Sequence, residues 1–281
     1  MSGPGLLELA TAEQENAKRH LYRLVPLCHA VAAVLVVLTL FVPLPWAYFL
    51  ALAVLLLQGF VWSLRGQGLG LHRRAEEARR RALLINALGE NAERLDVAKI
   101  QAAISKRACR AARQKDRSGY WASQAQQGTG RLLDEMQESA FWSMHLYAAA
   151  ARTMHKVLAA VVVGLALIAL VGFVVFSGDT DLAVARVIVV ALSSLIGVDV
   201  LGQVRAWQTA AAEAERVDRR LDKLDETVVE PMLAVVADYA VATASAPPIP
   251  DRVYEAEKDR LEELWRKHRS GTPPRAQSVS E

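Results

Sequence analysis

Residues 157–176 read VLAAVVVGLALIALVGFVVF, without one charged side chain. A helix of about 20 residues spans ~30 Å, the thickness of a bilayer's hydrocarbon core, where the backbone must satisfy its own hydrogen bonds. Three more apolar stretches of similar length run from about Leu24 to Val42, from Pro45 to Leu64 and from Leu182 to Leu201. Buried hairpins of a soluble bundle are the alternative, but soluble helices rarely lack a polar face. The sequence therefore predicts an all-α integral membrane protein with four transmembrane helices.

The four predicted spans form two hairpins whose turns lack Lys and Arg. Residues 43–45 join the first two spans, and residues 177–181 join the last two. Lys and Arg residues instead flank the other end of each span. Because cytoplasmic loops carry the excess of positive charge, this asymmetry predicts that both termini and residues 65–156 are cytoplasmic. The abundance of Ala, Arg and Val is typical of a high-GC bacterium, so we expect a multi-pass protein of the bacterial inner membrane.

Long cytosolic helical extensions are predicted on both hairpins. The basic insert between the hairpins either only enforces the topology or also attracts anionic lipid headgroups or an anionic ligand. The predicted segments are a cytosolic N-terminal helix (1–23), transmembrane hairpin 1 (24–64), a cytosolic helical insert (65–156), transmembrane hairpin 2 (157–201), a cytosolic amphipathic coiled-coil helix (202–245), and a Pro-linked C-terminal helix with a disordered tail (246–281).

The insert is predicted to contain a joint and several helices. Residues 66–70 read GQGLG and predict a flexible joint. Helices are expected over 71–87 and 91–115, with Gly89 as the break between them. A further helix begins near Leu132 and continues without interruption into the third span, so we expect one long rod that carries an apolar stripe.

Apolar residues after the fourth span repeat every seven positions, which predicts a coiled-coil seam of about three heptads. This seam needs a partner, either in the same chain or in another copy, and we expect a homo-oligomer. The repeating residues are Trp207, Ala214, Leu221 and Val228 in one row, and Ala210, Val217 and Leu224 in the other.

No stretch of the chain carries a specific catalytic motif. The zinc-protease, nucleophile-elbow and full phosphate-loop patterns are absent from the sequence, and the six histidines are scattered. Cys28 and Cys109 have no spacing that suggests a disulfide framework or a zinc site. We therefore expect a protein that is not an enzyme, that has no cofactor or metal, and that does not bind DNA.

Asp199 and Gln203 are the candidate pore or gating residues. Asp199 lies near the cytoplasmic end of the fourth span, and Gln203 lies one turn further along the same helix face. A charged residue within a membrane span is costly and is often functional. The alternative is an interfacial Asp that bonds to Gln203, to water or to a neighbouring helix.

Arg117, Tyr120, Trp121 and Arg131 are candidate ligand-binding or regulatory residues. They bracket a Gly-containing loop beside the long rod, and Arg with aromatic rings can hold a nucleotide by charge and stacking. The alternative is that the two aromatic rings only anchor the loop onto neighbouring helices.

Four aromatic residues are predicted to anchor the chain at the membrane interface. Trp46 and Trp62 bracket the second span, Tyr22 precedes the first, and Trp207 follows the fourth. Tyr and Trp are enriched at this depth because their rings are amphipathic.

The overall layout and two segments resemble the SMODS-associated four-transmembrane effectors, which belong to bacterial anti-phage systems that signal with cyclic oligonucleotides. The two-plus-two layout with a helical insert is similar, as are residues 247–254 (PPIPDRVY) and residues 138–142 (ESAFW) beside Tyr120 and Trp121. The insert has no counterpart of the acidic-aromatic Leu-Pro-Trp-Asn element. The resemblance implies a pore-forming or membrane-disrupting effector that is switched on by a cyclic nucleotide or by its sensor protein.

The leading functional hypothesis is a membrane effector that oligomerises and opens or disrupts the inner membrane upon a signal in anti-phage defence. The alternative is a membrane scaffold or sensor subunit that does not conduct. A small transporter is disfavoured, because transporters usually have broken helices and polar sites at mid-membrane. The lipid bilayer and further copies of the chain are the expected partners.

Overall fold

The regular elements of the described chain are all helices. The computed structural model describes residues 5–38, 42–89, 97–113, 123, 125–175, 200–224 and 229–271. Within these ranges the predicted all-α class is confirmed. The elements are α1 (Leu6–Arg19), the π-helical turn η1 (His20–Leu24), α2 (Val25–Leu38), α3 (Leu44–Leu88), α4 (Val97–Ala103), α5 (Lys106–Ala112), α6 (Thr129–Val175), α8 (Val200–Leu221), α9 (Val229–Ser245) and α10 (Asp251–Gly271).

Three helices are long and apolar enough to cross a membrane. They are the N-terminal helix over Leu6–Val36, the helix over Pro45–Leu88 and the helix over Thr129–Gly164. The predicted fourth span, 182–201, lies outside the described residues except at its last two positions. The described chain thus has the membrane-crossing capacity predicted for the first three spans.

The apolar halves of α2, α3 and α6, and the first turn of α8, expose large hydrophobic side chains. Leu55 and Leu56 are each 67% exposed, although side chains of this type are usually buried in a water-soluble protein. Contiguous apolar surface of this kind marks a membrane or partner interface. We call this surface the apolar band; its members include Leu27, Val31, Val34, Phe49, Leu52, Leu55, Leu56, Phe60, Val157, Val162, Val163, Leu167 and Leu201.

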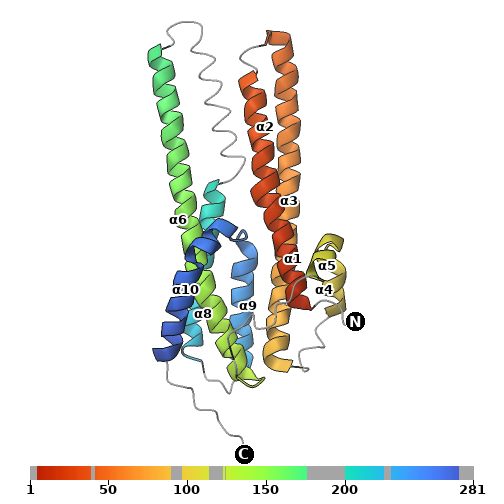
Figure 1. Cartoon of the computed structure of the whole chain (residues 1–281), viewed down its shortest axis with the longest axis vertical. Helices are drawn as coiled ribbons and strands as arrows, with labels where there is room; N and C mark the ends of the chain where they lie inside the picture. The colour runs from red at the N-terminus through yellow and green to blue at the C-terminus, as the bar shows by residue number, and fades with distance from the viewer. Residues whose placement is uncertain are drawn as a thin grey trace, which may run out of the picture.

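α3 and α6 are each one unbroken helix, as Figure 1 shows. Each carries part of the apolar band in one half and charged residues in the other. The predicted rod from Leu132 is therefore confirmed. The predicted flexible joint at 66–70 is wrong, because these residues are helical within α3. A Cβ on Gly68 would lie 2.8 Å from Leu21 Cγ, so this glycine lets η1 approach α3 closely.

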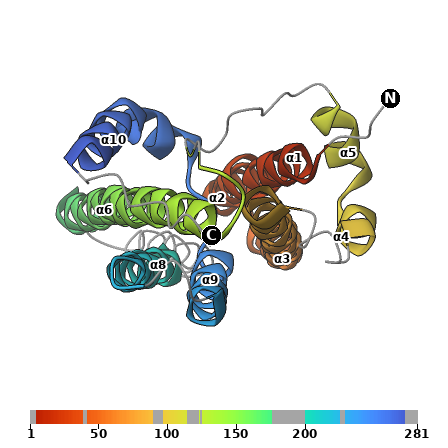
Figure 2. The same cartoon turned by 90° about the horizontal axis from the view of Figure 1, so that it is seen from below.

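The heptad seam on α8 packs against helices of the same chain. Trp207, Ala214 and Leu221 are fully buried. Leu221 and Ala214 belong to a core shared with Leu132 of α6 and Met232 of α9. Seen from below in Figure 2, α8 and α9 lie beside α6, while α10 covers the opposite side of α6. The seam on α8 and the apolar stripe on α6 are therefore both buried against helices of the same chain. Val228, the last residue of the predicted seam, lies outside the described residues.

The N-terminal helix packs against α3 and against two short helices. Within the described part of the predicted helix over 91–115, residues 97–113, the chain forms two helices, α4 and α5, that are separated at Ser105; residues 91–96 and 114–115 lie outside the described residues. The predicted break at Gly89 is confirmed, since α3 ends there and Gly89 has a positive φ of 71°. The Ser105 side chain accepts a hydrogen bond from the Ala108 amide and so starts a new helix. Leu9 and Ile104 lie in the core that joins α1 to these helices.

Candidate functional site

A cavity of about 410 Å³ lies beside the membrane-proximal ends of the helices. We call it the membrane-proximal cavity. η1, α2, α3, α6 and α8 form its walls, together with the end of α9 and the linker to α10. The lining is mostly apolar, with Arg65 as its cationic member and no carboxylate among the described residues. Its lining residues are Leu21, Tyr22, Val25, Pro26, His29, Arg65, Leu69, Met154, Gly202, Gln203, Ala206, Ser245 and Pro247.

A second cavity, of about 390 Å³, lies between α1, α3, α6 and α10. We call it the polar cavity. Its described lining has five carboxylates and two cationic side chains, so its charge favours a cation over an anion. The carboxylates are Glu15, Glu76, Glu138, Asp251 and Glu255, the cationic residues are Lys18 and Arg79, and aromatic rings come from Trp142, Tyr147 and Tyr254.

The linker between α9 and α10 divides the two cavities. Pro247 lines the membrane-proximal cavity, whereas Pro248 lines the polar one. The Trp207 indole donates a hydrogen bond of 2.9 Å to the Pro247 carbonyl, and the Tyr22 hydroxyl donates to the Pro248 carbonyl. These two bonds fasten the linker to α8 and to η1, which leads into α2.

Contacts across the polar cavity tie α10 to α1 and to α6. Lys18 Nζ lies 2.6 Å from Asp251 Oδ1. The rings of Trp142 and Tyr254 are 6.3 Å apart between centroids. Because the Asp251 side chain is 71% exposed, its ion pair with Lys18 stabilises the fold by no more than about 1 kcal/mol. Such a contact can open at little cost.

Two walls of the polar cavity bury ionisable groups, since α3 buries His72 and α6 buries Tyr147. His72 is 1% exposed, and burial lowers the pKa of its imidazole below the ordinary value, an effect opposed by nearby Glu76. Glu76 is paired with Arg79 at 2.7 Å. Burial raises the pKa of the Tyr147 hydroxyl well above its usual value. His72 and Tyr147 are therefore neutral at physiological pH, which leaves the charge of the cavity to its carboxylates and cations.

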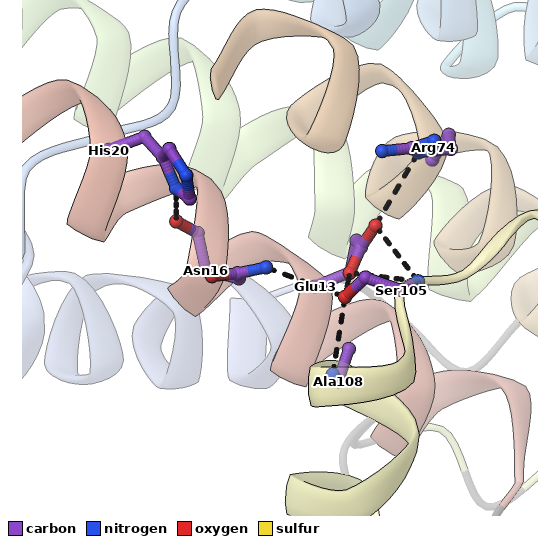
Figure 3. Close-up of polar contacts among 6 residues, drawn as sticks. All are labelled: Glu13, Asn16, His20, Arg74, Ser105 and Ala108. Atoms are coloured by element: carbon purple, nitrogen blue, oxygen red, sulfur yellow. Dashed lines mark hydrogen bonds and ion pairs between the residues drawn. The ribbon is translucent and has the colours of Figure 1, made fainter. Parts of the chain in front are cut away.

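A buried carboxylate on α1 holds the start of α5 in place (Figure 3). Glu13 is fully buried, and its Oε2 accepts a 2.5 Å hydrogen bond from the Ser105 hydroxyl. Arg74 Nε of α3 lies 3.4 Å from the other Glu13 oxygen. Asn16 Nδ2 also donates to Ser105 Oγ at 3.4 Å. This network joins α1, α3 and α5 by polar contacts that leave Glu13 paired on both oxygens.

The structure places the predicted pore residue Gln203 in the wall of the membrane-proximal cavity. Asp199 lies outside the described residues, so its relation to Gln203 stays a prediction. Arg65 and His29 share the cavity wall with Gln203.

The predicted regulatory residues are described only at Arg131. Arg117, Tyr120 and Trp121 lie outside the described part of the chain. Arg131 Nε lies 2.8 Å from Glu135 Oε1, and burial raises the pKa of that carboxyl although Arg131 opposes the shift. Arg131 therefore already has a buried partner one turn along α6.

The predicted membrane-interface anchors occupy different surroundings. Trp46 and Trp62 are exposed at 62% and 81%, as rings in contact with lipid would be. Tyr22 is half-buried in the wall of the membrane-proximal cavity. Trp207 is fully buried, so within one chain its ring is part of the bundle core and does not reach a lipid surface.

Sequence reasoning missed Glu13 and the polar cavity. Glu13 sits on a helix face whose other members are Leu6, Leu9 and Ala17, and a carboxylate on an apolar face was the available signal. The cavity brings together residues from four helices, and no local pattern marks such a set.

Comparison with known proteins gives no match. No family model, curated protein or solved structure is similar to this chain. Within the described residues, no group of three or more His, Cys, Asp and Glu side chains is arranged to hold a metal ion.

Proposed function

We propose that the protein is a membrane effector whose cytosolic bundle receives a signal and passes it to the membrane helices. Assembled copies then open a pore or disrupt the inner membrane, in the manner of the anti-phage effectors that the sequence resembles. The observation that carries this proposal is the continuity of α3 and α6, since each is one helix through both the bundle and the apolar band. A tilt imposed on such a rod at the bundle displaces its membrane end.

The polar cavity is the proposed entry point of the signal. Residues 138–142 and 247–254, the two segments that resemble the effectors, both contribute to its lining and meet at the Trp142–Tyr254 ring pair. The excess of carboxylates makes the cavity a poor site for a cyclic nucleotide, so we favour a sensor protein that presents basic side chains. A cyclic nucleotide remains the alternative signal, with Arg117, Tyr120 and Trp121 as its proposed contacts.

We further propose a multi-pass protein with both termini in the cytoplasm. The exposed apolar band supports the membrane location, and the distribution of Lys and Arg supports the orientation. Reporter fusions at Leu44 and at the C-terminus test it, since the first should report the periplasm and the second the cytoplasm. A C-terminal reporter active only in the periplasm contradicts this orientation.

A scaffold or sensor subunit that does not conduct is the second candidate. One observation favours it: the seam expected to drive assembly is satisfied within a single chain. A pore therefore needs another contact between copies, and the apolar band is the surface proposed for it.

Membrane potential in cells that express the full chain separates these candidates. The effector should depolarise the inner membrane upon induction, and Thr153→Pro should abolish this effect, because proline breaks α6 between the bundle and the band. Thr153 is exposed, and Thr153→Ala is the matched control that keeps the helix. Fractionation checks that each variant reaches the membrane.

If cells that express the parent chain keep their full membrane potential, the scaffold or sensor subunit is favoured. Equal depolarisation by the parent and Thr153→Pro would show that α6 does not transmit the signal.

A further inference from the structure

Basic side chains lie on several of the helices that form the membrane-proximal cavity. Arg65 of α3 lines the cavity itself. Three of the other wall elements carry an exposed basic residue within two positions of a lining residue: Arg23 on η1, Arg152 and Lys156 on α6, and Arg205 on α8; α2, α9 and the linker carry none. The described lining contains no carboxylate to offset this charge. Among the described lining residues the charge is therefore positive.

The apolar band begins at the edge of the same cavity. Leu27 and Leu201 directly adjoin lining residues of α2 and α8, and they are 60% and 58% exposed. Val157 follows the lining residue Met154 by three positions on α6 and is 50% exposed. The cavity thus lies where an apolar surface meets a group of cations, as at the boundary between acyl chains and headgroups in a bilayer.

Neutral polar groups line the cavity beside Arg65. Gln203 lies in the α8 wall and Tyr22 in the η1 wall. The ring of His29 lines the α2 side, and neither of its nitrogens has a hydrogen-bond partner among the described residues. A polar ligand group held here would meet one full positive charge and several hydrogen-bonding side chains.

We propose that the membrane-proximal cavity binds one anionic phospholipid from the cytoplasmic leaflet. Its phosphate lies against Arg65, near the amide of Gln203 and the imidazole of His29, and its acyl chains leave along the apolar band. Basic pockets between membrane helices are suited to such headgroups, and a cation near the leaflet strengthens binding about fivefold. The assignment does not depend on the proposed function, because lipid retention is measured without any signal.

Native mass spectrometry of the full chain tests the proposal. The protein is purified in detergent and incubated with equal amounts of phosphatidylglycerol and phosphatidylcholine. The parent should retain one phosphatidylglycerol in preference to phosphatidylcholine, and Arg65→Gln should weaken this preference about fivefold. Arg73→Gln is the matched control, because Arg73 is exposed on the same helix but does not line the cavity.

A second variant, Ala206→Phe, fills the cavity without changing its charge. It should lose both lipids, which separates a lipid inside the cavity from one adsorbed on the apolar band. Circular dichroism checks folding, and Arg65→Gln keeps the test valid if Ala206→Phe misfolds. The proposal fails if Arg65→Gln keeps the parental preference, or if folded Ala206→Phe keeps its lipid. Displacement of the lipid by glycerol phosphate would also overturn it, because a soluble phosphate would then suffice.

Discussion

Replacing Ser105 with alanine should release α5 from the rest of the bundle. The Ser105 hydroxyl accepts a 3.2 Å hydrogen bond from the Ala108 amide and donates a 2.5 Å bond to the buried Glu13 carboxylate. Losing the helix cap costs about 1 kcal/mol. Losing a hydrogen bond to a charged group costs about 1.5–3 kcal/mol. Local opening of α5 should therefore become easier by about 3 kcal/mol.

Cys109 offers a direct probe of this opening, because it is half-buried on α5 beside the core that α1 shares with α4 and α5. A change of about 3 kcal/mol should speed its labelling by a water-soluble thiol reagent roughly a hundredfold, since 1.4 kcal/mol corresponds to a factor of ten. Labelling is read by peptide mass, so that Cys28 is counted separately. Ser105→Thr keeps the hydroxyl and serves as the control. An unchanged Cys109 labelling rate in Ser105→Ala would refute the view that this network holds α5.

Three further substitutions test the packing. Gly68→Ala should lower the melting temperature, because the added Cβ would overpack against Leu21 at a cost of about 1–3 kcal/mol. The control Gly66→Ala has open space around its Cβ and should stabilise α3 by up to about 1 kcal/mol. Tyr239→Phe should cost about 1–3 kcal/mol in thermal unfolding, because it leaves the Ser139 carbonyl without the 3.0 Å bond it accepts; an unchanged melting temperature would contradict this role. The lowered pKa of His72 predicts that the free energy of unfolding falls as the pH drops below about 6.5. Below that pH the His72 imidazole binds a proton in the unfolded chain but stays neutral in the folded chain. His72→Leu should flatten this part of the melting profile, and an unchanged slope would show that other groups cause it.

Sequence reasoning succeeded where the signal is local. The rod from Leu132 and the break at Gly89 follow from side-chain periodicity and from the conformational freedom of glycine, both of which act within a few residues. It failed at residues 66–70, where the glycines were expected to interrupt a helix. There the close packing of Leu21 against Gly68 requires a residue without a side chain inside the helix. This contact joins residues that are distant in the chain, so no local pattern predicts it.

The candidate site was predicted only in part for the same reason. Gln203 was selected because it lies one turn from Asp199 on the same helix face, and it lines a cavity. Arg131 was selected for its charge, but Glu135 already pairs with it. No pattern along the chain indicated that Trp142 would face Tyr254, because that contact depends on how α10 docks on α6.

The sequence by itself determined the helical class, the stretches apolar enough for a membrane and the stripes that must be buried, because backbone hydrogen bonding and hydrophobic periodicity are local. Only the tertiary structure decided that the α8 seam is satisfied within the chain and that Trp207 belongs to the core. It also decided that two cavities of opposite charge lie on either side of the Pro-rich linker. These outcomes depend on which helices pack together. An apolar stripe in the sequence shows that a helix face must be buried, but it does not specify which helix will cover that face.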